Sequence, residues 1–172
     1  MTMRTRFTAS TLAGLIVGAS LLTNTGAAMA DSKDETETRN KALVTASFEA
    51  WANGTGSPYN LLADDATWTI VGKSLASKTY ESCEAFMSEV IRPFNVRMKV
   101  GLKPVIRRIY ADGDSVVIFF DASGTARDDK PYANTYAWFF DMRDGKVVKG
   151  TAFFDSIVFN DFWTRVSPAP SK

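Results

Sequence analysis

The chain has 172 residues, of which 45% are hydrophobic, and its 20 Lys and Arg residues nearly balance 19 Asp and Glu residues, for a formal net charge of +1. A chain so close to neutrality has no strong field to attract a polyanion, so nucleic-acid binding is not expected. The sequence contains no histidine, which excludes Ser-His-Asp and Cys-His nucleophiles and removes the commonest protein ligand of zinc; no metal or other cofactor is expected.

Residues 1–30 have the pattern of a secretory signal peptide. Arg4 and Arg6 are followed by an apolar run and then by a small-x-small sequence that predicts cleavage after Ala30. The apolar run is too short to span a membrane, so we expect a periplasmic or secreted protein without a membrane span. Without this segment, 18 basic residues face 19 acidic residues, and the single cysteine excludes an intramolecular disulfide.

One folded domain is expected over residues 39–166. Residues 31–38 are charged and contain no apolar residue, which predicts a flexible lead-in. Residues 167–172 are rich in proline and serine, and we expect a disordered tail there.

A helix is predicted from Arg39, because Val44, Phe48 and Trp51 recur at helical spacing, and Gly54 suits its C-terminal end. A short helix over residues 59–62 is expected next, since the preceding Ser-Pro pair provides a cap and a proline at the first helical position. A short strand follows over residues 66–72.

The clearest helix in the chain begins at Cys83. Apolar residues at positions 83, 86, 87, 90 and 91 form one stripe, and Pro93 is expected to end the helix. Cys83 lies on this stripe with no basic residue next to it, so a core position is favoured over a reactive thiol.

From residue 103 onward the hydrophobic period becomes two, and Asp-Gly and Asp-Lys-Pro sequences separate four β-rich runs. We predict a four-stranded antiparallel meander, followed by a last short helix or strand extension. Helices first and an antiparallel sheet afterwards indicate an α+β fold, with helices packed on one face of a curved sheet.

The order of these elements, together with "LLADDATWTIVG", "YADGDSVVIFFDASGTA", "YANTYAWFFDMRDGKVV" and "AFFDSIVF", resembles the SnoaL-like and ketosteroid-isomerase-like proteins of the nuclear transport factor 2-like superfamily over residues 40–165. The resemblance implies a cone-shaped fold with a blind pocket at its wide end. This scaffold carries isomerases, cyclases, epoxide hydrolases, dehydratases and noncatalytic binding modules, so it leaves the activity open.

The resemblance also implies where isomerase groups would lie. The aspartate base would stand at Ile70, the helix tyrosine near Phe48, and the protonated aspartate near Ala137, or at Tyr136 or Trp138 with a shift of one residue. None of these positions holds the isomerase residue, so isomerisation by that mechanism is not assigned. Epoxide hydrolases need an Asp-Arg-Asp cluster, and the available residues do not match that spacing.

Two aspartates are the candidate acid-base residues. Asp155 follows an apolar strand at the expected pocket end, although it also suits the cap of a following helix. Asp121 interrupts an apolar strand, and Asn134 lies on the strand expected to pair with it, so the two could face each other in the pocket or lie on the solvent face.

The expected pocket is rich in aromatic residues, which favours a small hydrophobic or aromatic ligand. Apolar residues on the outer face of the sheet favour a homodimer. We therefore expect ligand binding in the pocket, with a cofactor-free lyase, isomerase or hydrolase that uses a pocket aspartate, or a noncatalytic dimerisation module, as alternatives. The predicted pocket residues are Phe48, Trp51, Trp68, Ile70, Asn134, Tyr136 and Phe154.

Overall fold

The computed structural model describes the backbone of residues 24–168 and the side chains of residues 32–168. Most of the predicted signal peptide and most of the predicted tail lie outside the described residues. None of the helices within residues 24–168 has the length and apolar character that a membrane span requires.

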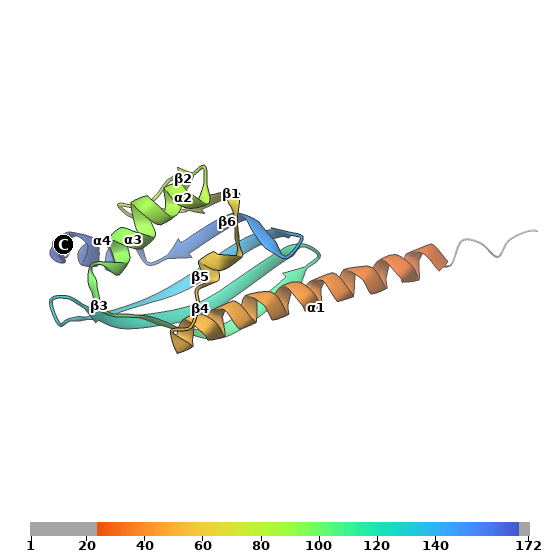
Figure 1. The fold of residues 1–172 in the computed structure, drawn as a ribbon, viewed down its shortest axis with the longest axis horizontal. Helices are drawn as coiled ribbons and strands as arrows, with labels where there is room; N and C mark the ends of the chain where they lie inside the picture. The colour runs from red at the N-terminus through yellow and green to blue at the C-terminus, as the bar shows by residue number, and fades with distance from the viewer. Residues whose placement is uncertain (1–23, 169–172) are drawn as a thin grey trace, which may run out of the picture.

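A six-stranded sheet with the strand order β2-β1-β6-β5-β4-β3 forms the body of the domain, and the helices cover one of its faces (Figure 1). β1 and β6 are parallel, whereas all other neighbouring strands are antiparallel, which confirms the predicted α+β fold. The strands are β1 Leu62–Ile70, β2 Thr79–Tyr80, β3 Met98–Asp112, β4 Ser115–Ala126, β5 Pro131–Arg143 and β6 Lys146–Phe154. The helical elements are α1 Asn24–Asn53, η1 Pro58–Leu61, α2 Cys83–Phe86, η2 Met87–Ile91, α3 Arg92–Asn95 and α4 Ser156–Arg165.

Helix α1 is longer than the sequence pattern predicts. It begins at Asn24 instead of near Arg39, and its N-terminal part projects beyond the sheet (Figure 1). The prediction of a flexible lead-in is therefore wrong for residues 32–38. These residues include no proline or glycine, and the Lys33 ammonium lies 2.6 Å from the Asp112 carboxylate, which ties the helix to the β3–β4 turn.

The chain between α1 and β1 follows the predicted turn chemistry. α1 ends before Gly54, whose φ of 72° is the left-handed conformation that glycine adopts without strain. The Ser57 hydroxyl then accepts a hydrogen bond from the Tyr59 backbone N–H at 3.2 Å and caps η1. η1 leads directly into β1, which starts at Leu62 and so four residues earlier than predicted.

The helical segment α2-η2-α3 continues past Pro93, so the prediction that this proline ends the helix is wrong. The Arg92 backbone N–H donates to the Met87 carbonyl, five residues back, which makes η2 a π-type turn. The wider turn accommodates a proline that would interrupt an ordinary α-helix. Cys83 is half-buried and packs against the core, as predicted.

Strands β3 to β6 form the predicted antiparallel meander. The β5–β6 turn contains Asp144 and Gly145 with φ values of 52° and 75°, as expected for a tight hairpin turn of the Asp-Gly type. β3 pairs with β4 through three register irregularities, and such bulges bend and twist a strand. The bent sheet curves around its inner face.

Trp68 of β1 is central to the buried face of the sheet. Its ring stacks on Phe86 with centroids 4.5 Å apart and meets Trp138 edge-on at 5.2 Å. Gly150 of β6 pairs with Trp68, and a Cβ atom at this glycine would lie 2.3 Å from the indole ring. The missing side chain at Gly150 therefore creates the space that the indole fills.

Candidate functional site

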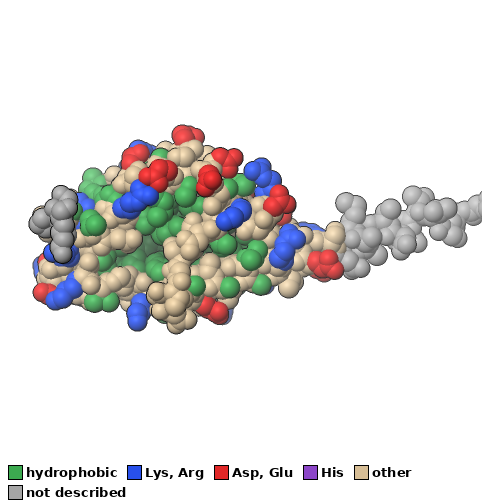
Figure 2. Space-filling model, in the orientation of Figure 1, with side chains coloured by type: hydrophobic (Ala, Val, Ile, Leu, Met, Phe, Trp, Pro, Cys, Tyr) green, Lys and Arg blue, Asp and Glu red, His purple; other side chains and the backbone are tan. Residues whose placement is uncertain are grey.

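A cavity of about 600 Å³ lies between the end of α1, the segment α2-η2-α3 and the inner face of the sheet. In Figure 2 it is visible as a recess lined by hydrophobic side chains, with charged side chains distributed around it. Its volume falls within the range of small-molecule pockets. Its aromatic lining residues are Trp51, Tyr59, Trp68, Phe86, Phe94, Tyr136, Trp138, Phe154 and Phe159.

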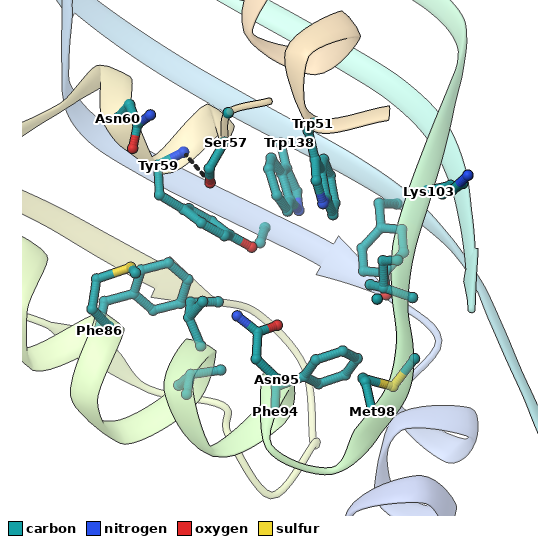
Figure 3. Close-up of a pocket in the computed structure, with 18 of the residues that line it drawn as sticks. Trp51, Ser57, Tyr59, Asn60, Phe86, Phe94, Asn95, Met98, Lys103 and Trp138 are labelled. Atoms are coloured by element: carbon teal, nitrogen blue, oxygen red, sulfur yellow. Dashed lines mark hydrogen bonds between the residues drawn. The ribbon is translucent and has the colours of Figure 1, made fainter. Parts of the chain in front are cut away.

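The aromatic rings of the lining hold one another in place. Trp51 of α1 and Trp138 of β5 stack with an interplanar angle of 10° and centroids 6.2 Å apart, and Tyr59 packs at 5.9 Å from Trp138 (Figure 3). Aromatic rings packed in this way offer flat apolar surfaces at little entropic cost. The cavity wall therefore suits a ligand with a flat apolar body.

Polar groups in the cavity are few and mostly uncharged. The Tyr59 hydroxyl and the Asn95 amide extend into the cavity in Figure 3. Among the described lining residues, Lys103 is the single charged one, and its ammonium points away from the cavity (Figure 3). The described lining contains no carboxylate.

The tyrosines of the cavity stay protonated at physiological pH. Burial raises the pKa of the Tyr59 hydroxyl far above its ordinary value. Burial, followed by the neighbouring Tyr132, raises the pKa of Tyr136 in the same direction. Both groups are therefore neutral hydrogen-bonding groups, and neither is a base near pH 7.

Five of the predicted pocket residues line the cavity and two do not. Phe48 is only 1% exposed and lies in the core, where its ring contacts Phe120 with centroids 4.8 Å apart. Asn134 is 6% exposed and forms hydrogen bonds within the protein. The five that line the cavity are Trp51, Trp68, Ile70, Tyr136 and Phe154.

Asp121 lies on the outer face of the sheet, away from the cavity. In the β4–β5 register, Asp121 pairs with Thr135 whereas Ala122 pairs with Asn134, and neighbouring residues of a strand point to opposite faces. The interpretation that Asp121 and Asn134 face each other in the pocket is therefore wrong. The Asp121 carboxylate accepts hydrogen bonds from Thr135 and from Arg107, and these lower its pKa, opposite to the change that a buried acid-base residue needs.

Asp155 caps helix α4. Its carboxylate accepts hydrogen bonds from the backbone N–H groups of Ile157 at 2.8 Å and Val158 at 3.3 Å. Asp155 is not among the residues that line the cavity. Of the two roles considered for this residue, the structure shows the cap.

The positions implied by the isomerase resemblance divide between the cavity and other places. Ile70 lines the cavity, so the position of the missing base lies inside it. Ala137 points to the outer face of β5, whereas its neighbours Tyr136 and Trp138 line the cavity. With a shift of one residue, the implied aspartate position therefore lies on the inward face of β5, which lines the cavity.

Several residues that line the cavity are not apparent as pocket residues from the sequence pattern. Tyr59 belongs to the predicted short helix, and the local pattern does not indicate that its hydroxyl reaches a cavity. The helical spacing of Met87, Val90 and Ile91 predicts a core stripe, and the same stripe lines the cavity. The cap at Ser57 and the helical period of residues 83–91 predict these elements, but not the space between them.

Within residues 24–168, no three Asp, Glu or Cys side chains gather in a way that could hold a metal ion.

Comparison with known families identifies the domain. The model of the SnoaL-like domain matches residues 44–150. The chain belongs to the SnoaL-like domain family. Its fold, with helices on a curved six-stranded sheet, is shared with proteins described as NTF2-like, as the resemblance implied. No curated protein sequence matches this SnoaL-like chain.

Solved structures with the same fold share little sequence with this SnoaL-like protein. An NTF2-like protein of unknown function from Burkholderia pseudomallei is 16% identical, with a TM-score of 0.61 over 73% of this chain and 98% of its own. TerC, co-crystallised with polyporic acid, is 20% identical, with a TM-score of 0.58 over 73% and 98%. An LEH-like epoxide hydrolase from M. tuberculosis is 18% identical, with a TM-score of 0.54 over 76% and 92%. At these identities the similarity shows the fold alone.

Proposed function

We propose that this SnoaL-like protein binds a small, uncharged, largely apolar molecule with a flat ring system in its cavity. The observation that carries the proposal is a cavity of about 600 Å³ whose lining is aromatic and, among its described residues, has one charged side chain. An ionised ligand would lose its hydration shell there without gaining a charged partner. An apolar ligand would instead replace water next to aromatic rings.

One further observation favours binding over acid-base catalysis by a pocket aspartate. Asp121 and Asp155 are engaged outside the cavity, the first with Arg107 and the second as a helix cap. A structure of the same fold, TerC, has been co-crystallised with polyporic acid, which supports the capacity of this scaffold to hold a small organic molecule.

Blocking the cavity from its mouth tests this proposal. Asn95 is exposed and lines the cavity, so Asn95→Trp should fill the opening and weaken binding of naphthalene-sized probes measured by ligand-observed NMR. Val96 is its neighbour, is 44% exposed and does not line the cavity, so Val96→Trp is the matched control. Equal affinities of both variants and the wild type, or no binding to the wild type, would contradict the proposal.

We also propose that the protein is a homodimer that buries the outer face of its sheet. Phe119, Phe139 and Phe153 are 36%, 43% and 43% exposed there, and the Phe139 and Phe153 rings lie 5.7 Å apart. A contiguous aromatic patch of this kind is costly to leave in water, and a second copy of the chain offers a complementary apolar surface. Sedimentation equilibrium should give twice the monomer mass, and Phe139→Lys should give the monomer mass; a monomeric wild type would refute the dimer.

Export is the third part of the proposal, and it rests on the sequence pattern of residues 1–30. N-terminal sequencing of protein recovered from the periplasm or the medium should begin at Asp31. Retention of Met1 in the mature protein would be incompatible with this proposal.

A further inference from the structure

A buried chain of hydrogen bonds connects the start of α4 to the cavity. It runs through Asn134, Tyr132 and Tyr136, all on strand β5, and these side chains are 6%, 1% and 7% exposed. The Asn134 Nδ2 donates to the Tyr132 hydroxyl at 3.2 Å, and the Tyr132 and Tyr136 hydroxyl oxygens lie 3.2 Å apart. Of the three, Tyr136 lines the cavity.

Backbone groups determine the orientation of the Asn134 amide. Its Oδ1 accepts hydrogen bonds from the backbone N–H groups of Thr135 at 2.8 Å and Asp155 at 3.0 Å. Its Nδ2 donates to the Asp155 carbonyl at 3.0 Å. A flipped amide would place an NH₂ group against two N–H donors, so the orientation is unambiguous. The Tyr132 oxygen therefore accepts a hydrogen bond from Asn134.

This orientation sets the direction of the two hydroxyl protons. If Tyr136 donated to Tyr132, the proton of the Tyr132 hydroxyl would be buried without an acceptor among the described residues. If Tyr132 donates to Tyr136, the Tyr132 proton has an acceptor. The Tyr136 proton then points into the cavity. Buried polar groups are nearly always hydrogen-bonded, which favours the second arrangement. Donors linked in one direction also strengthen one another.

A second hydroxyl faces the same space. The Tyr59 hydroxyl extends into the cavity in Figure 3, and no hydrogen-bond partner for it exists among residues 32–168. Tyr59 and Tyr136 both line the cavity, and their rings pack against the same residue, Trp138, with centroids 5.9 Å and 6.2 Å away. The cavity lining therefore includes two phenolic donors without protein acceptors, alongside the Asn95 amide.

We propose that Tyr136 and Tyr59 bind an oxygen acceptor, such as a ketone carbonyl, on the flat apolar ligand. Tyr132 and Asn134 act as positioning residues that direct the Tyr136 proton into the cavity. The inference rests on the proposed ligand binding and specifies its chemistry, because it predicts that the cavity distinguishes a ketone from a hydrocarbon of the same shape.

The test compares α-tetralone with tetralin, which has the same ring skeleton and a CH₂ group in place of the carbonyl. The wild-type protein should bind α-tetralone more tightly, by about two- to tenfold for each hydrogen bond to the carbonyl, measured by ligand-observed NMR. Tyr136→Phe and Tyr59→Phe should each reduce this preference and leave tetralin affinity unchanged. Tyr132→Phe should also reduce the preference, a change that a purely structural role would not produce.

Tyr80→Phe is the matched control. The Tyr80 hydroxyl is buried and donates to the Ala76 carbonyl at 2.7 Å, and Tyr80 does not line the cavity. This variant should lose stability but keep the ketone preference. Tyr59→Phe breaks no protein hydrogen bond, so it remains a usable test if the Tyr136 variant unfolds.

The outcomes separate the two proposals. Equal affinity of the wild type for both probes would contradict the proposal that Tyr136 and Tyr59 bind a carbonyl. It would not contradict the proposal that the cavity binds a ligand. A ketone preference that survives both Tyr59→Phe and Tyr136→Phe would overturn the assignment to these residues. Failure of the wild type to bind either probe would count against the cavity as a binding site and against this inference together.

Discussion

Asn40 is the residue at which the structure departs most clearly from ordinary packing. It lies on the buried face of α1 with Val44 and Phe48, is 1% exposed, and neither amide atom has a hydrogen-bond partner among the described residues. An unpaired buried amide costs about 1–3 kcal/mol. Asn40→Leu keeps the branching at Cγ and removes the polar atoms, so it should raise the free energy of unfolding by about 1–3 kcal/mol in urea denaturation.

The control for Asn40→Leu is Glu49→Leu, on the exposed face of the same helix. It should change stability by less than about 0.5 kcal/mol, as surface substitutions usually do. A loss of stability in Asn40→Leu would show that the amide is satisfied in solution.

At the scale of elements, the contact between β1 and β6 depends on Gly150. A Cβ atom there would lie 2.3 Å from the Trp68 ring, so Gly150→Ala must displace an indole that also lines the cavity. We expect Gly150→Ala to lower the free energy of unfolding by about 1–3 kcal/mol, as overpacked cores do, and to weaken ligand binding. Chemical denaturation and the NMR binding assay measure both effects.

Gly101 provides the comparison for this variant. It lies in a strand and lines the cavity, but a Cβ atom there would meet nothing within 4 Å. Gly101→Ala should therefore change stability little. If Gly150→Ala proved as stable as Gly101→Ala, the close packing of Trp68 on β6 would be refuted.

For the whole molecule, the pKa values of the buried tyrosines predict that the free energy of unfolding falls at high pH. Burial raises the pKa of Tyr80 to about 12 and raises the pKa values of Tyr59 and Tyr136 as well, above the value near 10 of an unfolded chain. A raised pKa in the folded state gives stability that is complete below pH 10 and is lost as the pH rises through the folded-state pKa. The free energy of unfolding should thus be flat from about pH 6 to 8, where no histidine titrates, and should fall above pH 10 by up to about 1.4 kcal/mol per pH unit for each tyrosine.

Urea denaturation followed by circular dichroism over a pH series measures this profile. Tyr80→Phe should reduce the slope above pH 10, whereas Tyr110→Phe should not, because Tyr110 is 58% exposed. A transition between pH 6 and 8 would contradict the assignment of alkaline sensitivity to buried tyrosines.

Local chemistry explains which parts of the fold could be predicted. The Ser57 cap, the glycine after α1 and the Asp-Gly turn between β5 and β6 depend on neighbours within a few residues, and each forms as expected. Two predictions are wrong for reasons that lie outside the local sequence pattern. A π-type turn accommodates Pro93, so the helix does not end there, and the contact of Lys33 with Asp112 holds the charged residues before Arg39 in α1.

The sequence by itself determined the fold class, the order of the elements and the aromatic character of the interior, because hydrophobic periodicity and turn residues act locally. Only the tertiary structure decided which polar residues meet. Strand alternation and the exact register place Asp121 outside and Asn134 inside, and the packing of η1 over the sheet places Tyr59 in the same cavity as Tyr136. The identity of the site depends on these long-range juxtapositions, since a shift of one residue moves every side chain of a strand to the other face.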